Sequence, residues 1–301
     1  MQAIIATFVS EKEMTVMANS DQNNSPLRID VGEVVRQRVP RYYKRIPHFM
    51  ISWLSRIIHQ DELNEILQLM HEAGDGLPAV DAANRYLGVS AELVHEERIP
   101  EQGRFIFASN HPLGGLDGLA LLSLMGHRYG GEHIRFMVND LLMAVRPLRP
   151  LFLPVNKYGC QSRQEASDIE SQYAGTNQML TFPAGLCSRQ MSGGDIHDLP
   201  WQPSVASMAV RSQRDIVPLY FDGVNSRRFY RLAHLRKQLG IKFNYEMVLL
   251  PDEVVRGRGK HFKVYVGQPV PWQSLDSRHP RQEAERLCRL TYALAPSQGG
   301  Q

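Results

Sequence analysis

Short apolar runs recur along the chain from about residue 90, and stretches with helical spacing of apolar residues separate them. Short continuous apolar runs are typical of buried strands, and the longer periodic stretches are typical of helices. The predicted strands are Leu93–His95, Arg104–Ser109, Ile134–Val138, Leu151–Val155, Gln178–Phe182, Ile216–Phe221, Tyr245–Leu250 and Lys263–Val266. The predicted helices are Leu119–Met125, Asp140–Val145, Gln164–Tyr173, Ser204–Ser212, Ser226–Leu239 and Arg281–Leu294. This alternation predicts an α/β fold, with a mostly parallel sheet flanked by helices.

The chain before residue 90 has helix patterns and no strand pattern. Amphipathic stretches at Asp61–Ala73 and Ala79–Tyr86 follow a shorter helix candidate, Val31–Val39. We therefore predict a helical N-terminal extension over residues 30–88 and the main α/β domain over 89–296. Residues 1–29 are mostly polar in their second half and are predicted to be a flexible leader.

The stretch Phe49–His59 allows two interpretations. On a helix its polar residues His48, Ser52, Ser55 and His59 form one narrow stripe, and nearly everything else is apolar. Such a helix either packs on the core of the domain or lies in a membrane interface, where Trp53 and the flanking basic residues are favourable. The pattern leaves both interpretations open.

Composition narrows the functional classes. A formal charge of +3 over 301 residues is too weak to indicate a nucleic-acid partner. The 3 cysteines are widely spaced, which argues against a disulfide framework or a zinc site and favours a reducing compartment. No run reaches the roughly 18 apolar residues of a membrane span, and the N-terminus lacks the basic region of a signal peptide. A cytoplasmic protein is expected.

The stretch Asn110–Gly118 carries the first candidate chemistry. It joins a predicted strand to a predicted helix, and open α/β folds place their sites at such turns. His111 can act as a base near neutral pH. Asp117 either orients that histidine or caps the following helix, and the two roles remain open. Gly114 and Gly115 allow the backbone to approach a ligand closely.

Three further stretches contribute candidate residues. Thr181–Arg189 is a strand followed by a Pro/Gly turn, and its arginine suits a carboxylate or phosphate, although a solvated surface arginine is the alternative. Cys187 in the same stretch is predicted to be an inert thiol, because no local feature lowers its pKa. Leu153–Gly159 ends a strand with a lysine, and Ile216–Pro218 is apolar. The chain has no G-x-S-x-G, P-loop, G-x-G-x-x-G or H-E-x-x-H motif, which removes several enzyme classes.

Taken in order, the four stretches resemble the sequence blocks of the glycerolipid acyltransferase superfamily, which includes 1-acylglycerol-3-phosphate acyltransferases. That family has an N-H-x-x-x-x-D block, a block with a basic residue, an F-P-E-G-T-R-S block and an apolar I-V-P strand. The matching segments here are Asn110–Asp117, Val155–Gly159, Phe182–Arg189 and Ile216–Pro218.

Two departures point to one branch of the superfamily. Five residues rather than four separate His111 from Asp117, and Ala184 stands where the family usually has glutamate. Both features are similar to the hemolysin-like branch, and in particular to Bacteroidetes enzymes of glycine-lipid synthesis that act as N-acyltransferases.

The resemblance implies the following expectations. His111 and Asp117 are catalytic, with the histidine as general base. The residues implied to bind substrate are Asn110, Gly114, Gly115, Lys157, Pro183, Gly185, Ser188 and Arg189. No metal or cofactor is implied, and the co-substrate is an acyl thioester of acyl-carrier protein or coenzyme A.

The implied acceptor is the amine of a small amino acid, with glycine first, and the implied location is the inner face of the membrane. O-acylation of a lysophospholipid is the alternative on the same machinery. A non-enzymatic, membrane-binding, hemolysin-like protein is the alternative of another class.

Overall fold

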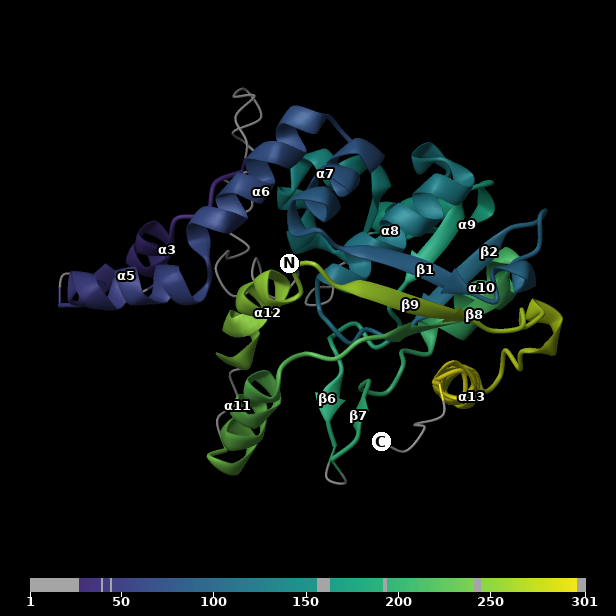
Figure 1. Cartoon of the computed structure of the whole chain (residues 1–301). Helices are drawn as coiled ribbons and strands as arrows, with labels where there is room; N and C mark the ends of the chain where they lie inside the picture. The colour runs from purple at the N-terminus through teal and green to yellow at the C-terminus, as the bar shows by residue number, and fades with distance from the viewer. Residues whose placement is uncertain are drawn as a thin grey trace.

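The computed structural model describes residues 27–38, 40–43, 45–155, 163–191, 194–240 and 245–296. Within these residues a seven-stranded sheet has the order β1-β9-β8-β2-β5-β3-β4. Its strands are β1 (Ser90–Val94), β2 (Phe105–Ser109), β3 (Ile134–Asn139), β4 (Phe152–Val155), β5 (Gln178–Thr181), β8 (Asp215–Asp222) and β9 (His261–Val266). The strands from β8 to β4 in this order are parallel, whereas β9 pairs with β8 in the antiparallel sense and β1 is parallel to β9. The mostly parallel α/β fold predicted from the sequence is confirmed (Figure 1).

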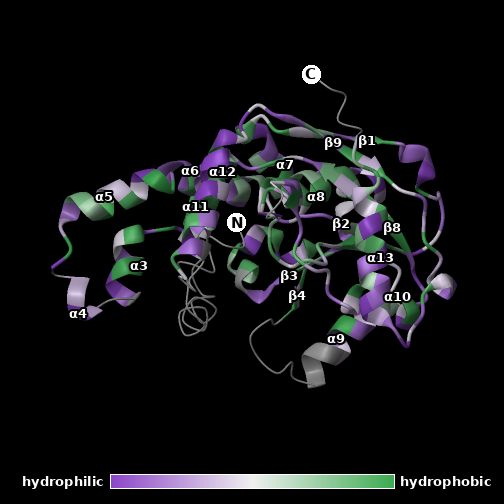
Figure 2. Ribbon diagram, turned by 90° about the horizontal axis from the view of Figure 1, so that it is seen from below, coloured by the Kyte–Doolittle hydropathy of each residue, from purple (hydrophilic) through white to green (hydrophobic). Residues whose placement is uncertain are grey.

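Helices cover both faces of this sheet. The α-helices are α3 (Val31–Arg38), α4 (Pro40–Tyr43), α5 (His48–Ile57), α6 (Gln60–Ala73), α7 (Leu77–Leu87), α8 (Leu116–Tyr129), α9 (Arg163–Ala174), α10 (Ser204–Ser212), α11 (Arg227–Gln238), α12 (Leu250–Arg256) and α13 (Pro280–Tyr292). Short 3-10 helices are η1 (Glu96–Arg98), η2 (Gly131–His133), η3 (Asp140–Ala144), η4 (Arg146–Leu151), η5 (Tyr245–Leu249) and η6 (Trp272–Ser274). Figure 2 shows the mixture of hydrophobic and hydrophilic residues on α10 and α13 that is typical of helices with one buried face.

The central strand β2 separates two hydrophobic cores. Phe105 and Phe107 belong to the core beneath α6, α7 and α8. Ile106 and Ala108 belong to the core beneath α9, α10 and α13. Successive side chains of a strand point to opposite faces, so a strand buried on both sides is apolar throughout. This explains why β2 was recognisable as an uninterrupted apolar run.

The N-terminal helices extend beyond the sheet. In Figures 1 and 2, α3, α4 and α5 project from the body of the molecule as an arm. One side of α5 (Ile51, Leu54) packs against a third, smaller core. Its other side exposes Phe49 and Trp53, with 72% and 61% of their surface accessible. Helix α5 thus packs on one side and presents aromatic residues to solvent on the other.

The predicted leader falls largely outside the described residues, because the described part begins at Leu27. The few leader residues that are described are held by α6. The side chain of Asn64 accepts from the backbone N–H of Ile29 at 2.7 Å and donates to the carbonyl of the same residue at 2.9 Å. Gln60 accepts from the N–H of Val31 at 2.8 Å. This segment is therefore attached to the extension.

One predicted element was wrong. Residues Tyr245–Leu250 do not form a strand, since they form η5 and the first residue of α12. A short apolar run does not distinguish strand from helix by itself, and Pro251 in the first turn favours the helix. The helix predicted at Asp140–Val145 is present as the 3-10 helix η3. A small antiparallel pair, β6 (Arg189–Gln190) and β7 (Ile196–His197), was too short to be predicted.

Candidate active site

The site lies where β2 ends and the chain turns into α8. Gly114 in this turn has φ +77°, a conformation that favours glycine, and a Cβ there would lie 3.0 Å from Leu250 Cδ1. Helix α8 begins at Leu116, so Gly115 is its N-cap residue and Asp117 lies in its first turn. The predicted N-cap position of Asp117 is therefore wrong, although the carboxylate still bonds the start of the helix.

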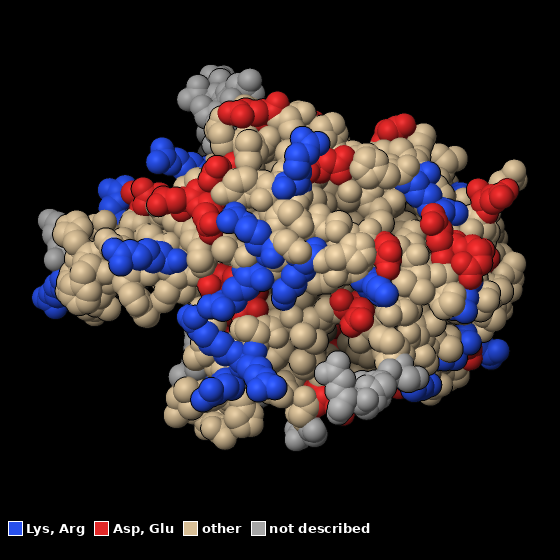
Figure 3. Space-filling model, in the orientation of Figure 1, with Lys and Arg blue, Asp and Glu red and all other residues tan. Residues whose placement is uncertain are grey.

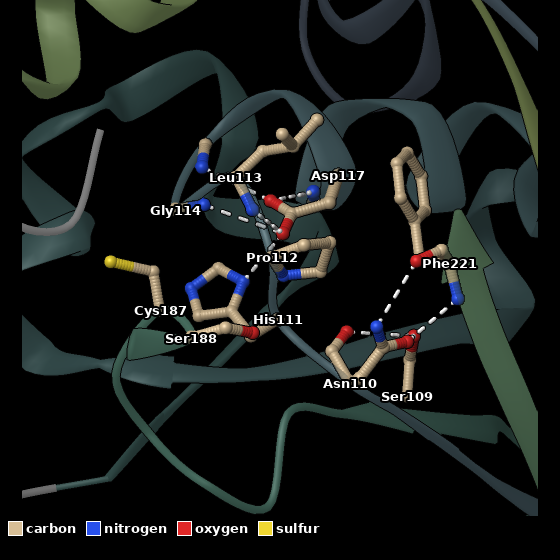
Figure 4. A network of polar contacts seen from close by, with 12 residues as sticks. Ser109, Asn110, His111, Pro112, Leu113, Gly114, Asp117, Cys187, Ser188 and Phe221 are labelled. Carbon is tan, nitrogen blue, oxygen red and sulfur yellow. Dashed lines mark hydrogen bonds and ion pairs between the residues drawn. The ribbon is translucent and has the colours of Figure 1, made fainter. Parts of the chain in front are cut away.

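The Asp117 carboxylate joins the histidine to the turn. Its Oδ2 lies 2.8 Å from Nδ1 of His111 and accepts from the N–H groups of Leu113 at 2.8 Å and Gly114 at 3.3 Å. Its Oδ1 accepts from the N–H groups of Gly115 and Gly118, each at 3.0 Å. The two roles that the sequence left open, orienting His111 and stabilising the helix start, therefore belong to one side chain (Figure 4).

Electrostatics keep Asp117 ionised. Complete burial by itself raises the pKa of this carboxyl, but the His111 imidazole and the N–H groups of Leu113 and Gly118 outweigh that penalty. The pKa of Asp117 consequently lies below its ordinary value. An ionised carboxylate can only accept hydrogen bonds, so Nδ1 of His111 must be the nitrogen that carries the proton.

This tautomer leaves Nε2 of His111 as the basic nitrogen. Within the described part of the chain Nε2 has no hydrogen-bond partner. The ring is held in place by Phe182, which stacks on it with centroids 3.9 Å apart and planes 17° apart. Two contacts thus orient the imidazole: a carboxylate at its Nδ1 edge and an aromatic ring on its face. This is the arrangement that a general base requires.

A buried carboxylate from a distant part of the chain supports the turn. Asp198, 2% exposed, accepts from the backbone N–H of His111 at 3.2 Å and from the Ser188 hydroxyl at 2.6 Å. Its other oxygen accepts from the Trp201 indole at 2.9 Å. The N–H of Ser188 donates to the carbonyl of His111 at 2.8 Å. Sequence reasoning missed Asp198, because it lies after β7, outside the four blocks.

Several predicted substrate-binding residues have structural contacts in this turn. The side chain of Asn110 donates to the carbonyl of Phe221 at 3.0 Å and accepts from its N–H at 2.6 Å, so it bonds the end of β2 to β8. Ser188 binds Asp198, as described above. Gly185 has φ +68° in the turn after Phe182, and the carbonyl of Pro183 accepts from a backbone N–H at 3.0 Å.

Of the two cations predicted to bind substrate, Arg189 lies among the described residues and Lys157 does not. Arg189 is buried, and its guanidinium lies 3.7 Å from the carboxylate of Glu246 and over the ring of Phe229. It also donates to Sγ of Cys187 at 3.0 Å. Burial raises the pKa of that thiol despite the neighbouring guanidinium, in keeping with an inert cysteine. Lys157 lies outside the described residues.

An apolar pocket of about 350 Å³ opens beside His111. Gly114, Gly115 and Gly118 line it on the side of the turn. The remaining walls are apolar side chains from α8, β3, β4 and the connecting segments, namely Leu119, Leu122, Phe136, Leu142, Leu148, Phe152 and Phe182. A basic nitrogen at the end of such a pocket suits a reaction at the polar end of an aliphatic chain.

A family model described as "Acyltransferase" matches residues 33–299, which is most of the chain. The protein belongs to this acyltransferase family, and the resemblance to glycerolipid acyltransferases is confirmed. It is therefore an enzyme of acyl transfer in lipid synthesis, and the non-enzymatic alternative is set aside.

Two curated relatives carry the same description, "Lyso-glycine lipid O-acyltransferase". The protein from Phocaeicola vulgatus is 41% identical over 273 residues, which are 90% of this chain and 97% of the relative. The protein from Bacteroides thetaiotaomicron is 42% identical over 275 residues, which are 90% of this chain and 99% of the relative. Among solved structures, the 1-acyl-sn-glycerophosphate (LPA) acyltransferase PlsC from Thermotoga maritima is 16% identical. That match covers 72% of this chain and 80% of PlsC, with a TM-score of 0.41.

Proposed function

We propose that the protein transfers an acyl chain from a thioester carrier to the hydroxyl group of a lyso-lipid whose polar group is glycine. The observation that carries this proposal is the position of His111, which has no hydrogen-bond partner at Nε2 among the described residues and lines an apolar pocket that suits an acyl chain. The description shared by the two relatives supplies the acceptor class. No cofactor is needed, because a thioester is already activated for attack.

In the proposed reaction, Nε2 of His111 takes the proton of the acceptor hydroxyl while its oxygen attacks the thioester carbonyl carbon. The tetrahedral intermediate then collapses, the carbon–sulfur bond breaks, and the imidazolium returns the proton to the departing thiolate. Asp117 stays ionised and stabilises the imidazolium through Nδ1. Positioned general-base catalysis of this kind contributes a factor of about 10²–10⁴.

The acceptor atom is where this proposal differs from the expectation drawn from sequence. The sequence favoured an amine, as in acylation of glycine itself, whereas the relatives' description names O-acylation. Acylation of its amine leaves glycine with one negative charge, the carboxylate. Lys157 and Arg189 stay the proposed cations for this carboxylate, and Arg189 also lies 3.7 Å from Glu246.

The test offers the purified protein three acceptors with the same acyl thioester of acyl-carrier protein or of coenzyme A. They are an N-(hydroxyacyl)glycine, free glycine and a lysophosphatidic acid. We expect a product from the first that mild alkali cleaves, because esters are labile to alkali and amides are not. An alkali-stable product from free glycine would instead favour N-acylation, and a product from lysophosphatidic acid alone would favour the phospholipid alternative.

We also place the protein on the inner face of the membrane, with α5 in contact with lipid. No helix among the described residues has the length and apolar character of a membrane span. The exposed residues Phe49, Met50 and Trp53 of α5 form an apolar patch, and Arg45 and Arg56 beside it are also exposed. Aromatic residues flanked by cations suit the interface of an anionic membrane. Figure 3 shows further basic side chains gathered over α11 and α12.

Sedimentation with vesicles tests this location. The double variant Phe49→Ser/Trp53→Ser should lower binding to anionic vesicles about tenfold or more, because each change exposes less apolar surface to lipid. Turnover of a detergent-dispersed acceptor should be unchanged. The matched control is Tyr42→Ser, which changes an exposed aromatic residue of α4. Equal binding of the double variant and the wild type would contradict a role for α5.

A further inference from the structure

A second apolar pocket lies on the other side of the start of α8. The space within its outline, including the part open to solvent, is about 550 Å³. Leu63, Ile66 and Leu67 of α6 form one wall, and Val254 of α12 lies on another. Every other lining residue is also apolar or glycine, so the pocket offers an occupant no charged group and no side-chain hydrogen bond. An aliphatic chain is the kind of ligand that gains from such a lining.

One wall of this pocket is the extended segment that precedes α3. Leu27 and Ile29 line the pocket. The two hydrogen bonds between Asn64 and the backbone of Ile29, and the bond from Val31 to Gln60, hold this segment on α6. The wall is consequently fixed by specific polar contacts at its outer side, while its inner side is apolar.

The second pocket meets the first one at the catalytic turn. Gly115 and Leu119 line both. His111 lines the first pocket, and its partner Asp117 accepts from the N–H of Gly115. The two apolar spaces therefore diverge from the beginning of α8, within reach of one catalytic group.

We propose that this second pocket binds the chain that the acceptor lipid already carries, while the pocket lined by His111 receives the chain being transferred. The inference rests on the proposed function, because acylation of a lyso-lipid must bring two chains to one reacting carbonyl. A product with two chains then leaves one in each pocket, and the ester lies at the junction. The N-terminal extension thereby becomes part of the substrate-binding site.

Matched substitutions separate the two pockets. Leu67 lines only the second pocket and Leu142 only the first, and their exposures are similar, 7% and 5%. Replacing either by phenylalanine adds about three carbon atoms of bulk to a buried site. Leu67→Phe should shift the preferred acceptor chain to one shorter by about three carbons and leave the preferred donor chain unchanged. Leu142→Phe should do the reverse.

The size of the effect follows from burial. Each methylene group moved from water into an apolar site contributes about a fourfold gain in binding. Losing about three of them should raise the KM for the longest acceptor on the order of 50-fold in Leu67→Phe. Thermal unfolding of both variants shows whether they are folded. If Leu67→Phe shifts the donor preference, or shifts neither preference, the inference is overturned.

A binding experiment decides the inference even if the wild type fails to turn over lyso-lipids, which would refute the proposed function alone. The probe is an N-(hydroxyacyl)glycine with a diazirine near the end of its chain, photolysed with the full-length protein. Peptides from α6 or from the segment at Leu27–Ile29 should carry the label. Labelling confined to the pocket of Phe136 and Phe152, or no labelling above that of a denatured control, overturns the inference.

Discussion

Replacing Asp117 by asparagine keeps the shape of the side chain and removes its charge. The carboxylate has His111, Leu113 and Gly114 on one oxygen and Gly115 and Gly118 on the other. An amide has only one oxygen, so its NH₂ group must face one of these two sets of N–H donors.

Either orientation takes the Asp117 acceptor away from two backbone N–H groups. If the amide oxygen replaces Oδ2, the N–H groups of Gly115 and Gly118 lose their acceptor. If it replaces Oδ1, those of Leu113 and Gly114 lose theirs, and the NH₂ group can donate to Nδ1 of His111. An unsatisfied buried donor costs about 1–3 kcal/mol. The free energy of unfolding should therefore fall by about 2–4 kcal/mol if Gly115 and Gly118 lose their acceptor, because Gly115 is only half-buried, and by about 2–6 kcal/mol if Leu113 and Gly114 lose theirs.

The second orientation also changes the histidine. A donor facing Nδ1 forces the proton onto Nε2, and the base is lost. We expect kcat to fall by a factor of about 10²–10⁴, with a smaller change in KM. Urea unfolding and initial rates at a low temperature, where the variant stays folded, measure the two effects. His111→Gln is the control, because it should lose activity with a smaller loss of stability.

The pH dependence of the free energy of unfolding provides a second test of the role of Asp117. A carboxyl whose folded pKa is depressed stabilises the protein above its unfolded pKa of about 3.9, and this stabilisation is lost as the pH falls through the lower folded value. The stability gap between wild type and Asp117→Asn should therefore be constant near neutrality and narrow below about pH 4. A gap below about 1 kcal/mol at pH 7, or a variant with normal kcat, would refute the role given to Asp117.

Three further substitutions test the surroundings of the base. Phe182→Leu removes the ring that stacks on His111 and should lower kcat about tenfold, and it should also raise the KM for the acyl donor because Phe182 lines the pocket, which steady-state kinetics will show. Asp198→Asn leaves one of three hydrogen-bond donors without its acceptor. The free energy of unfolding, measured by chemical unfolding, should fall by about 1–3 kcal/mol, and kcat should fall as well. Full activity would contradict the positioning role of Asp198. Glu246→Gln removes the buried carboxylate that lies 2.9 Å from Arg236 and 3.7 Å from Arg189 and should destabilise the fold by about 3 kcal/mol, measured the same way, whereas an unchanged stability would show that these ion pairs contribute little.

The contact between His111 and Asp117 was predictable because it is local. His111 and Asp117 lie six positions apart in one turn, and a strand followed by a helix brings them together. The central strand was predictable for a similar reason, since burial on both faces requires an uninterrupted apolar run. Helical spacing likewise predicted α6 and α10 close to their observed bounds.

The rest of the site depends on contacts between distant segments. Asp198 reaches His111 across 87 positions, and Asn110 reaches Phe221 across 111. Nothing near either residue in the sequence reveals its partner. Arg189 was predicted either to bind a carboxylate or phosphate or to lie solvated at the surface, and in the folded chain it is buried with Glu246 beside it. Pairings of this kind become visible only when the fold is known.

The two hydrogen bonds between the Asn110 side chain and the backbone of Phe221 have a consequence for the deamidation of this asparagine. Asparagine deamidates when the next backbone nitrogen attacks its side-chain carbonyl, and that nitrogen belongs here to His111. Its N–H already donates to Asp198, and the amide oxygen of Asn110 is held by the N–H of Phe221. The attacking N–H and the side-chain amide are each held in place by other partners, and these hydrogen bonds must break before the nitrogen can reach the amide carbon, so the conversion of Asn110 to aspartate should be slow. Such a conversion would set a buried negative charge against the carbonyl of Phe221 and separate the ends of β2 and β8.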